Sequence, residues 1–187
     1  MLTSTPAKRP YLPAAERRRQ LLDAAGRLFD RSGFSGIIMA GIATEAKVSR
    51  QLVYGHFADL DSLYIAFVQD RLGRYRGGLP DISTLPPANA AATMFQHLLT
   101  IPSSDRRVIR LLLADVGIPA LGRVRKRFVA DELSRWGDVL ATSEAAAVVS
   151  AVTSALLALA DAVDAGDISA TPATDIAVRL VRAATRE

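Results

Sequence analysis

The sequence MAGIATEAKVSRQLVYGHF, residues 39–57, contains two short helical patterns separated by a tight turn. Apolar residues at the i, i+3, i+4 and i+7 spacing of one helix face predict a helix over about residues 39–46. The residues with this spacing are Met39, Ile42, Ala43 and Ala46. Val48 and Ser49 interrupt the pattern, and Ser49 is a good N-cap for a second helix ending near Phe57.

A longer helix is predicted before this pair. From Ala14 onward an apolar stripe repeats with helical period, while charged residues fill the other faces. The stripe consists of Leu21, Leu22, Ala25, Leu28 and Phe29. Ser32 and Gly33 end this helix, and we expect Gly33 to be left-handed. Three short helices with a tight turn between the last two predict a helix-turn-helix, in which the third helix lies in the major groove of DNA.

The remainder of the chain is also predicted to be helical. A fourth helix starts at Asp59 or Asp61 and runs to about Arg76, and glycine and proline residues separate the later segments. These later helices are expected over about residues 88–101, 104–115, 119–141, 143–165 and 172–186. The fold class is therefore all-α, with about nine helices. We expect a flexible basic arm over residues 1–13, a helix-turn-helix head over 14–58, and a helical effector-binding and dimerisation body over 59–187.

The charge of the chain is unevenly distributed. The 187 residues carry a net charge of +4, and half of them are hydrophobic, which is enough to form a sizeable core. Residues 1–76 hold 12 basic and 7 acidic side chains, whereas residues 77–187 hold 11 and 12. A basic front half and a nearly neutral rear half predict a head that binds a polyanion and a body with another task.

Several classes of function lack the residues they would need. There are no cysteines, and the two histidines, His56 and His97, lie far apart, so thiolate and histidine-cluster metal sites are excluded. No nucleophile–base pair or paired carboxylates stand out. We therefore expect no enzyme, catalytic residue, metal or cofactor. The start of the chain lacks the apolar segment of a signal peptide.

The longest apolar run, residues 145–160, is shorter than the roughly 20 residues of a membrane span. We interpret it as a helix buried in the protein, and expect a cytoplasmic protein without a membrane segment.

The first turn of the third helix is expected to face base edges. Arg50 can bind guanine and Gln51 adenine in bidentate fashion, each worth about 1–3 kcal/mol of discrimination. Ser49 shares this turn, and Leu52 either contacts a thymine methyl or packs beneath the helix. The residues suited to phosphate contacts are Arg17, Arg18, Lys47, Tyr54 and His56, together with the Lys8–Arg9 arm. The alternative is that Arg50 and Gln51 form an ordinary solvated helix face.

Residues 17–64, RRRQLLDAAGRLFDRSGFSGIIMAGIATEAKVSRQLVYGHFADLDSLY, resemble the N-terminal signature of the tetracycline-repressor-like (TetR/AcrR) family. The residues that carry the resemblance are Leu22–Ala25, Leu28–Phe29, Gly33–Phe34, Ile42–Ala43, Ala46, Val48–Ser49, Val53–Tyr54, His56–Phe57 and Leu63. The resemblance implies that Ser49 to Leu52 face the bases while Tyr54 and His56 contact the DNA backbone. It also implies a homodimeric, ligand-responsive transcriptional regulator, a repressor that a small molecule releases from a palindromic operator.

Three departures from the family pattern affect the expected phosphate contacts. Ile37 and Ile38 stand where the family usually opens the second helix with threonine or serine. Lys47 replaces the usual glycine of the turn and must accept its backbone strain, and Leu60 replaces a common lysine. We expect weaker or differently registered backbone contacts. The alternative function is a helical ligand-binding or scaffold protein with weakened or lost DNA binding.

The body is expected to supply a dimer interface and a pocket. The small-residue helix near 143–163 and the amphipathic helix Asp175–Ala184 can pack against their symmetry mates, or alternatively close the monomer core. The resemblance implies a mostly apolar effector pocket. Its candidate residues, each of which is alternatively plain core, are Tyr64, Phe67, Met94, Phe95, His97, Leu111, Phe128 and Trp136. The basic run 123–127 suggests an anion-binding site, but we favour the interpretation that it forms a solvated helix face.

Overall fold

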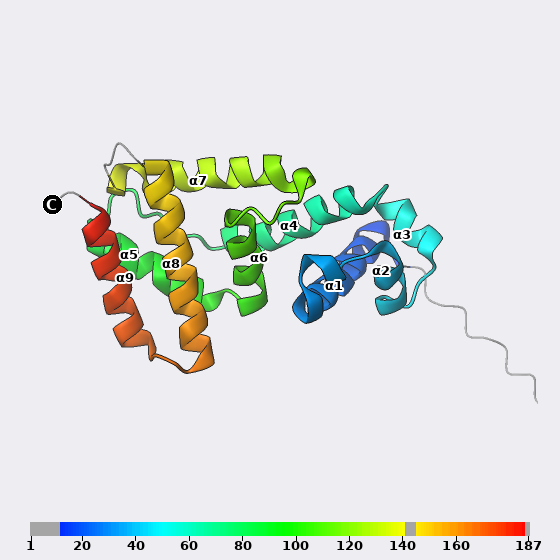
Figure 1. The fold of residues 1–187 in the computed structure, drawn as a ribbon, viewed down its shortest axis with the longest axis horizontal. Coiled ribbons are helices and arrows are strands. Elements are labelled where there is room, and N and C mark those ends of the chain that lie inside the picture. The colour runs from blue at the N-terminus through cyan, green and yellow to red at the C-terminus, as the bar shows by residue number, and fades with distance from the viewer. Residues whose placement is uncertain (1–11, 141–144, 186–187) are drawn as a thin grey trace, which may run out of the picture. The chain divides into compact units, whose positions relative to one another are not determined.

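The computed structural model describes residues 12–140 and 145–185, and the expected arm lies almost wholly outside this part. The described residues form nine α-helices and two short 3₁₀ helices, without a strand (Figure 1). The predicted all-α class with about nine helices is therefore confirmed. The chain divides into two compact units at Leu60, here called the head and the body.

The head consists of α1 (Ala14–Ser32), η1 (Phe34–Gly36), α2 (Met39–Glu45) and α3 (Arg50–His56). Its core contains the apolar stripe predicted for the first helix, except for the partly buried Leu28, together with one face each of α2 and α3. The largest of these buried side chains are Leu21, Phe29, Phe34, Ile37, Ile42 and Phe57. The rings of Phe29 and Phe34 meet edge to face, with centroids 5.1 Å apart. Val48, in the turn between α2 and α3, is only partly buried.

Gly33 ends α1 in a conformation that differs from the predicted one. Its φ of 65° is positive, as expected, but its ψ of −160° is extended and not left-handed helical. This region of backbone space is essentially restricted to glycine. The Gly33 N–H still donates to the Phe29 carbonyl oxygen at 2.7 Å, so the chain leaves α1 with one helical carbonyl satisfied and enters η1 directly.

The body is built from six α-helices. They are α4 (Leu60–Arg76), α5 (Pro87–Thr100), α6 (Ser103–Leu113), α7 (Gly122–Leu140), α8 (Ala145–Ala165) and α9 (Ala170–Ala184), with η2 (Pro119–Leu121) before α7. The segment expected as one helix over 119–141 is thus split into η2 and α7. Figure 1 shows α8 and α9 side by side, and both pack on α5. Aromatic side chains fill the interior, where the rings of Tyr75 and Phe128 meet with centroids 5.8 Å apart.

Helix α8 is long and apolar enough to cross a membrane, judged by length and composition alone. The window Ala146–Ala165 has a mean hydropathy of 1.9, yet only 33% of it is buried inside the chain. The expectation of a buried helix therefore holds for only part of α8. The helix packs against α5, α6, α7 and α9 in the described structure. Asp161 and Asp164, in its last turns, bind arginines of α6.

Arg106 is a buried ionic connector between α5, α6 and α8. Its side chain is 1% exposed and donates to the carbonyl oxygens of Leu98, at 3.0 Å, and Ile101. The same guanidinium binds Asp161, with Nε at 3.1 Å from Oδ1, and Asp164. The five N–H groups of an arginine can satisfy several acceptors at once. Arg106 therefore joins the end of α5 to the end of α8, a role not predicted from the sequence.

A second buried polar pair joins α4 to α7. The Tyr75 hydroxyl donates to Glu132 Oε2 at 3.1 Å, and the Glu132 residue is 2% exposed. Burial raises the pKa of Glu132 above its usual value and raises that of Tyr75 as well. The interaction fixes the rotation of α7 about its axis, because Glu132 must point toward α4.

We predict that Arg106→Met lowers the free energy of unfolding by about 3 kcal/mol, because it leaves two carbonyl oxygens and two carboxylates without their shared donor. Urea unfolding monitored by circular dichroism measures the change. Arg179→Met, at an exposed position of α9, is the matched control and should be nearly neutral. A loss below 1 kcal/mol for Arg106→Met would contradict the proposed connector.

Candidate DNA-binding interface

The local structure of α3 determines which of its side chains point outward. The Leu52 N–H donates to Ser49 Oγ at 3.2 Å, which confirms the predicted N-cap. Val53 is 0% exposed and Phe57 is 2% exposed. Because these two residues lie on one face of α3, the positions on its opposite face point away from the core. The outward-facing positions of α3 and its cap, all exposed, are Ser49, Arg50, Gln51, Tyr54 and Gly55.

The remaining two predicted contacts on α3, Leu52 and His56, are half-buried. The hydroxyl of Ser49 already accepts the capping bond, but its hydrogen remains able to donate to another acceptor. Arg50 has no acidic partner among the described residues. Its guanidinium is therefore available for a ligand.

Gly55 leaves the outer face of α3 without a side chain between Tyr54 and His56. A Cβ added at this position would meet nothing within 4 Å, so no contact inside the described structure requires a glycine. Glycine in a helix interior costs about 1 kcal/mol relative to alanine. The missing side chain allows another surface to approach the backbone of α3 closely.

The turn between α2 and α3 places Lys47 in a left-handed conformation, with a φ of 55°. Its N–H donates to the Thr44 carbonyl oxygen at 3.1 Å, and the Val48 N–H donates to that of Ala43 at 2.9 Å. These bonds satisfy carbonyls at the end of α2, as in a Schellman motif. The expected backbone strain at this non-glycine residue is present, and the side chain of Lys47 is exposed.

The start of α2 lacks the hydroxyl cap usual in the family. Ile38 occupies the N-cap position, with an extended backbone and no side-chain hydrogen bond to the helix. Ile37 is fully buried and holds the segment to the core, whereas Ile38 is 52% exposed. At the third departure, Leu60 is half-buried and is the first residue of α4.

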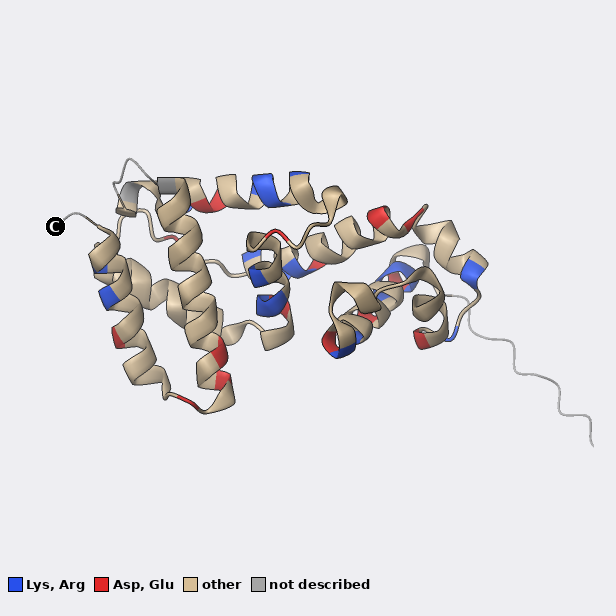
Figure 2. Ribbon diagram, in the orientation of Figure 1, with Lys and Arg blue, Asp and Glu red and all other residues tan. Residues whose placement is uncertain are grey.

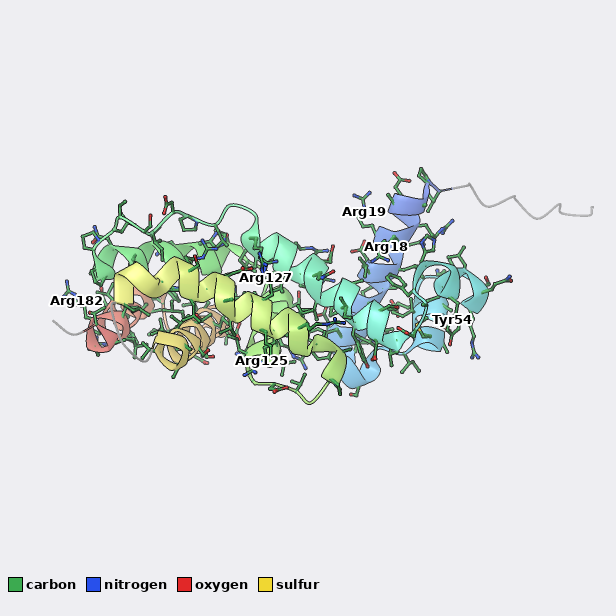
Figure 3. The ribbon with its side chains drawn as sticks, turned by 90° about the horizontal axis from the view of Figure 1, so that it is seen from above. Arg18, Arg19, Tyr54, Arg125, Arg127 and Arg182 are labelled. Atoms are coloured by element: carbon green, nitrogen blue, oxygen red, sulfur yellow. The ribbon has the colours of Figure 1, made fainter. Side chains whose placement is uncertain are left out.

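Arg17 and Arg18 of α1 are both engaged within the head. Arg17 donates to Gln20 Oε1 at 2.6 Å. Arg18 lies 4.5 Å from the centroid of the Phe57 ring and donates to the His56 carbonyl oxygen at 3.3 Å. Arg18 therefore connects α1 to the end of α3 while remaining exposed. Figure 3 shows Arg18 beside Arg19, an exposed cation that the sequence analysis did not single out.

At the other end of α1, two arginines share one carboxylate of α2. Arg27 Nε lies 2.6 Å from Glu45 Oε1, and Arg31 binds the second oxygen of the same carboxylate. Hydrogen bonds from Arg31 and then Arg27 lower the pKa of Glu45. These two arginines are thus paired with α2. The head also carries cations at the start of α1, in the turn and on α3 (Figure 2).

The residues proposed for an effector pocket do not gather around one described cleft. Phe67, Met94, Phe95, Phe128 and Trp136 are buried, whereas Tyr64, His97 and Leu111 are half-buried. His97 Nε2 lies 2.9 Å from the Tyr75 carbonyl oxygen, which gives the ring a structural partner. None of the eight lines the α4–α7 or the α7–α8 cleft. Their role in ligand binding stays a prediction.

Residues 21–67 match the family model described as "Bacterial regulatory proteins, tetR family". The chain is 37% identical over 65 residues to the HTH-type transcriptional regulator HbdR of Aromatoleum sp. (strain CIB), covering 35% of this chain and 28% of that protein. It is 38% identical over 68 residues to the HTH-type transcriptional activator FasR of Mycolicibacterium smegmatis, covering 36% of this chain and 31% of that protein. The chain thus spans less than a third of the length of either curated relative.

The similarity of fold extends over nearly the whole chain. A TetR-like transcriptional regulator from Rhodococcus sp. RHA1 superposes with a TM-score of 0.71 at 24% identity, covering 92% of this chain and 97% of that one. A structure of the multidrug binding protein EbrR complexed with imidazole superposes with a TM-score of 0.61 at 23% identity, covering 88% of this chain and 94% of that one. The architecture is that of a helix-turn-helix head on a TetR-like helical body. The N-terminal segment thus matches the tetR family of bacterial regulatory proteins, which confirms the resemblance seen in the sequence.

We predict that Lys47→Gly raises the free energy of unfolding by about 0.5–1 kcal/mol. Relief of the left-handed strain, roughly 1–2 kcal/mol, exceeds the added freedom of the unfolded chain. Lys126→Gly makes the same chemical change within the right-handed helix α7 and should destabilise by about 1 kcal/mol. Urea unfolding compares the two variants, and a loss of stability for both would contradict the strain assigned to Lys47.

Proposed function

We propose that this protein is a sequence-specific DNA-binding transcriptional regulator, acting as a repressor that a small molecule releases from a palindromic operator. The observation that carries the proposal is the exposed face of α3, with Arg50 and Gln51 outward and Val53 inward. This face lies within the segment that matches the tetR-family model.

The side chains divide into two kinds of proposed contact. Arg50 and Gln51 contact guanine and adenine edges, Ser49 donates its hydroxyl hydrogen, and Leu52 contacts a thymine methyl. The proposed backbone contacts come from Arg17, Arg18, Lys47, Tyr54 and His56. We propose that residues 1–13 are a basic arm, residues 14–58 the DNA-binding head, and residues 59–187 the effector-binding and dimerisation body.

The last two helices are the proposed dimer interface. Exposed small residues recur along α8 at Ala147, Ala151 and Ala158, a spacing that places them on one side of a helix. Leu180 of α9 is 39% exposed, although it is a large apolar residue. Small side chains allow helices to approach closely. Packing of α8 and α9 against their symmetry mates would cover the apolar length of α8 that the chain itself leaves exposed.

The body is proposed to bind the small-molecule effector. A ligand with higher affinity for a conformation that fits the operator poorly shifts the population away from DNA. EbrR, similar in fold, is described as a multidrug binding protein, which supports a ligand-binding body. We further propose a cytoplasmic location and no catalytic activity, cofactor or metal. The described residues contain no group of three potential metal ligands.

The direct experiment is a gel shift and footprint on the DNA upstream of the chain's own gene. The proposal predicts a protected palindrome, with affinity falling steeply as salt rises because phosphate contacts release counterions. No protection at low salt would contradict DNA binding and favour the alternative, a ligand-binding or scaffold protein. A reporter assay without the protein then distinguishes repression from activation.

Substitutions separate the two kinds of contact. Arg50→Ala should relax specificity at one base position of each half-site, whereas Lys47→Ala should weaken all sequences alike. Competition binding on single-base operator variants measures both effects, with about 1–3 kcal/mol of discrimination lost for Arg50→Ala. Identical behaviour of the two variants would refute the assignment.

We predict that Leu180→Asp shifts the protein from dimer to monomer, because it places a charge in the proposed apolar interface. Size-exclusion chromatography with light scattering gives the mass directly. Val116→Asp is the control, since Val116 is similarly exposed, at 37%, but lies outside α8 and α9. A dimer that survives Leu180→Asp unchanged would remove α9 from the interface.

A further inference from the structure

A cleft of about 270 Å³ lies between α4 and α7 within the body. Three arginines line it, Arg76 from α4 and Arg123 and Arg127 from α7. Its apolar lining includes Ile65, Leu72 and Val124. One cleft therefore combines an apolar wall with several cations.

The arginines of the cleft exceed the acids that face them. Arg76 lies 2.8 Å from Asp131 Oδ2, and Arg127 lies 3.0 Å from Oδ1 of the same carboxylate. Arg123 is exposed and has no acidic partner among the described residues. One carboxylate thus pairs with two of the three guanidinium groups, and no acidic side chain lines the cleft itself. The local potential is positive and favours an anion.

The basic run 123–127 is not a uniform solvated face. Arg125 donates to the Leu113 carbonyl oxygen at 3.2 Å, and with Lys126 it lines a different cleft toward α8. Figure 3 shows Arg125 and Arg127 on opposite sides of α7, with Arg127 on the side of α4. Arg123 and Arg127 are one helical turn apart and therefore lie on the same face of α7. Together with Arg76, which is 47 residues earlier in the chain than Arg123, they line the α4–α7 cleft.

The size and lining of the cleft limit the rest of the ligand. A volume of 270 Å³ equals roughly nine water molecules at about 30 Å³ each, which suits a small organic molecule. No aromatic side chain lines the cleft, so stacking on a planar ring is not available. The isoleucine, leucine and valine side chains instead match an aliphatic chain.

We propose that the α4–α7 cleft binds an amphipathic organic anion, with its charged group at Arg123, Arg127 and Arg76 and its aliphatic part against Ile65, Leu72 and Val124. This inference names the chemical class of the effector. That the bound anion regulates DNA binding rests on the proposed function. The binding itself does not depend on DNA.

Isothermal titration of the full chain with octanoate tests the proposal. Octanol and octylamine carry the same aliphatic chain without charge or with the opposite charge. Saturable binding is expected for octanoate, at least about tenfold tighter than for either analogue, because a hydrogen bond to a charged group is worth about 1.5–3 kcal/mol. Equal affinities for octanoate and octanol would overturn the proposal.

Variants locate the site. Arg123→Gln should weaken octanoate binding about tenfold, and Gln69→Glu, which adds a carboxylate to the cleft at constant shape, should weaken it similarly. Lys126→Gln removes one charge from the same helix outside the cleft and should leave binding unchanged. Thermal unfolding checks that each variant is folded. Equal losses for Arg123→Gln and Lys126→Gln would show non-specific attraction and overturn the assignment.

DNA binding is measured on the same samples. Octanoate binding without any footprint would refute the proposed function and leave the cleft assignment standing. A footprint without octanoate binding would refute the cleft assignment alone.

Discussion

Burial of Val53 and Phe57 in the head core is the constraint on which the proposed interface depends. The two residues lie one helical turn apart, so burying both fixes the rotation of α3 about its axis. Arg50, Gln51 and Tyr54 are then exposed. Arg18 reinforces this arrangement by binding both the Phe57 ring and the carbonyl of His56. The apolar side chains of α3 thus determine the chemistry that its outer face presents.

Arginine has two separate roles in the molecule. Arg106 is 1% exposed and donates its N–H groups to carbonyl and carboxylate oxygens. These bonds hold α5, α6 and α8 together. Arg50 and Arg123, both exposed and without acidic partners among the described residues, contribute no comparable internal contact. The buried group stabilises the body, whereas the exposed groups leave positive charge available to ligands. The outer face of α3 and the α4–α7 cleft are thus two places where exposed positive charge is available.

Features set by local sequence could be predicted, and features set by distant contacts could not. The period of apolar residues predicted the α-helices of the head to within a residue or two, and Ser49 was recognisable as a cap. The strained backbone at Lys47 was expected from the family resemblance, because the turn usually carries glycine. The ψ of Gly33 depends on where the chain must go next, which the helix-ending pattern does not encode.

Pairings between helices were also beyond the sequence pattern. Arg27 and Arg31 of α1 both pair with Glu45 of α2, a contact between helices that the apolar pattern does not indicate. The pocket candidates were selected by residue type, but aromatic side chains fill the core of the body as readily as a ligand site. The α4–α7 cleft combines residues from two helices whose relative rotation depends on Tyr75 and Glu132.

The central claim is that the exposed face of α3 reads base sequence. Selection of binding sites from a library of random duplexes, without assumptions about the target gene, tests it most directly. The account predicts enrichment of an inverted repeat whose half-site centres lie about 34–36 Å apart, or a multiple of that distance, as two recognition helices of a dimer require. Enrichment of no sequence over the starting library, at a salt concentration where the protein still binds DNA, would contradict it.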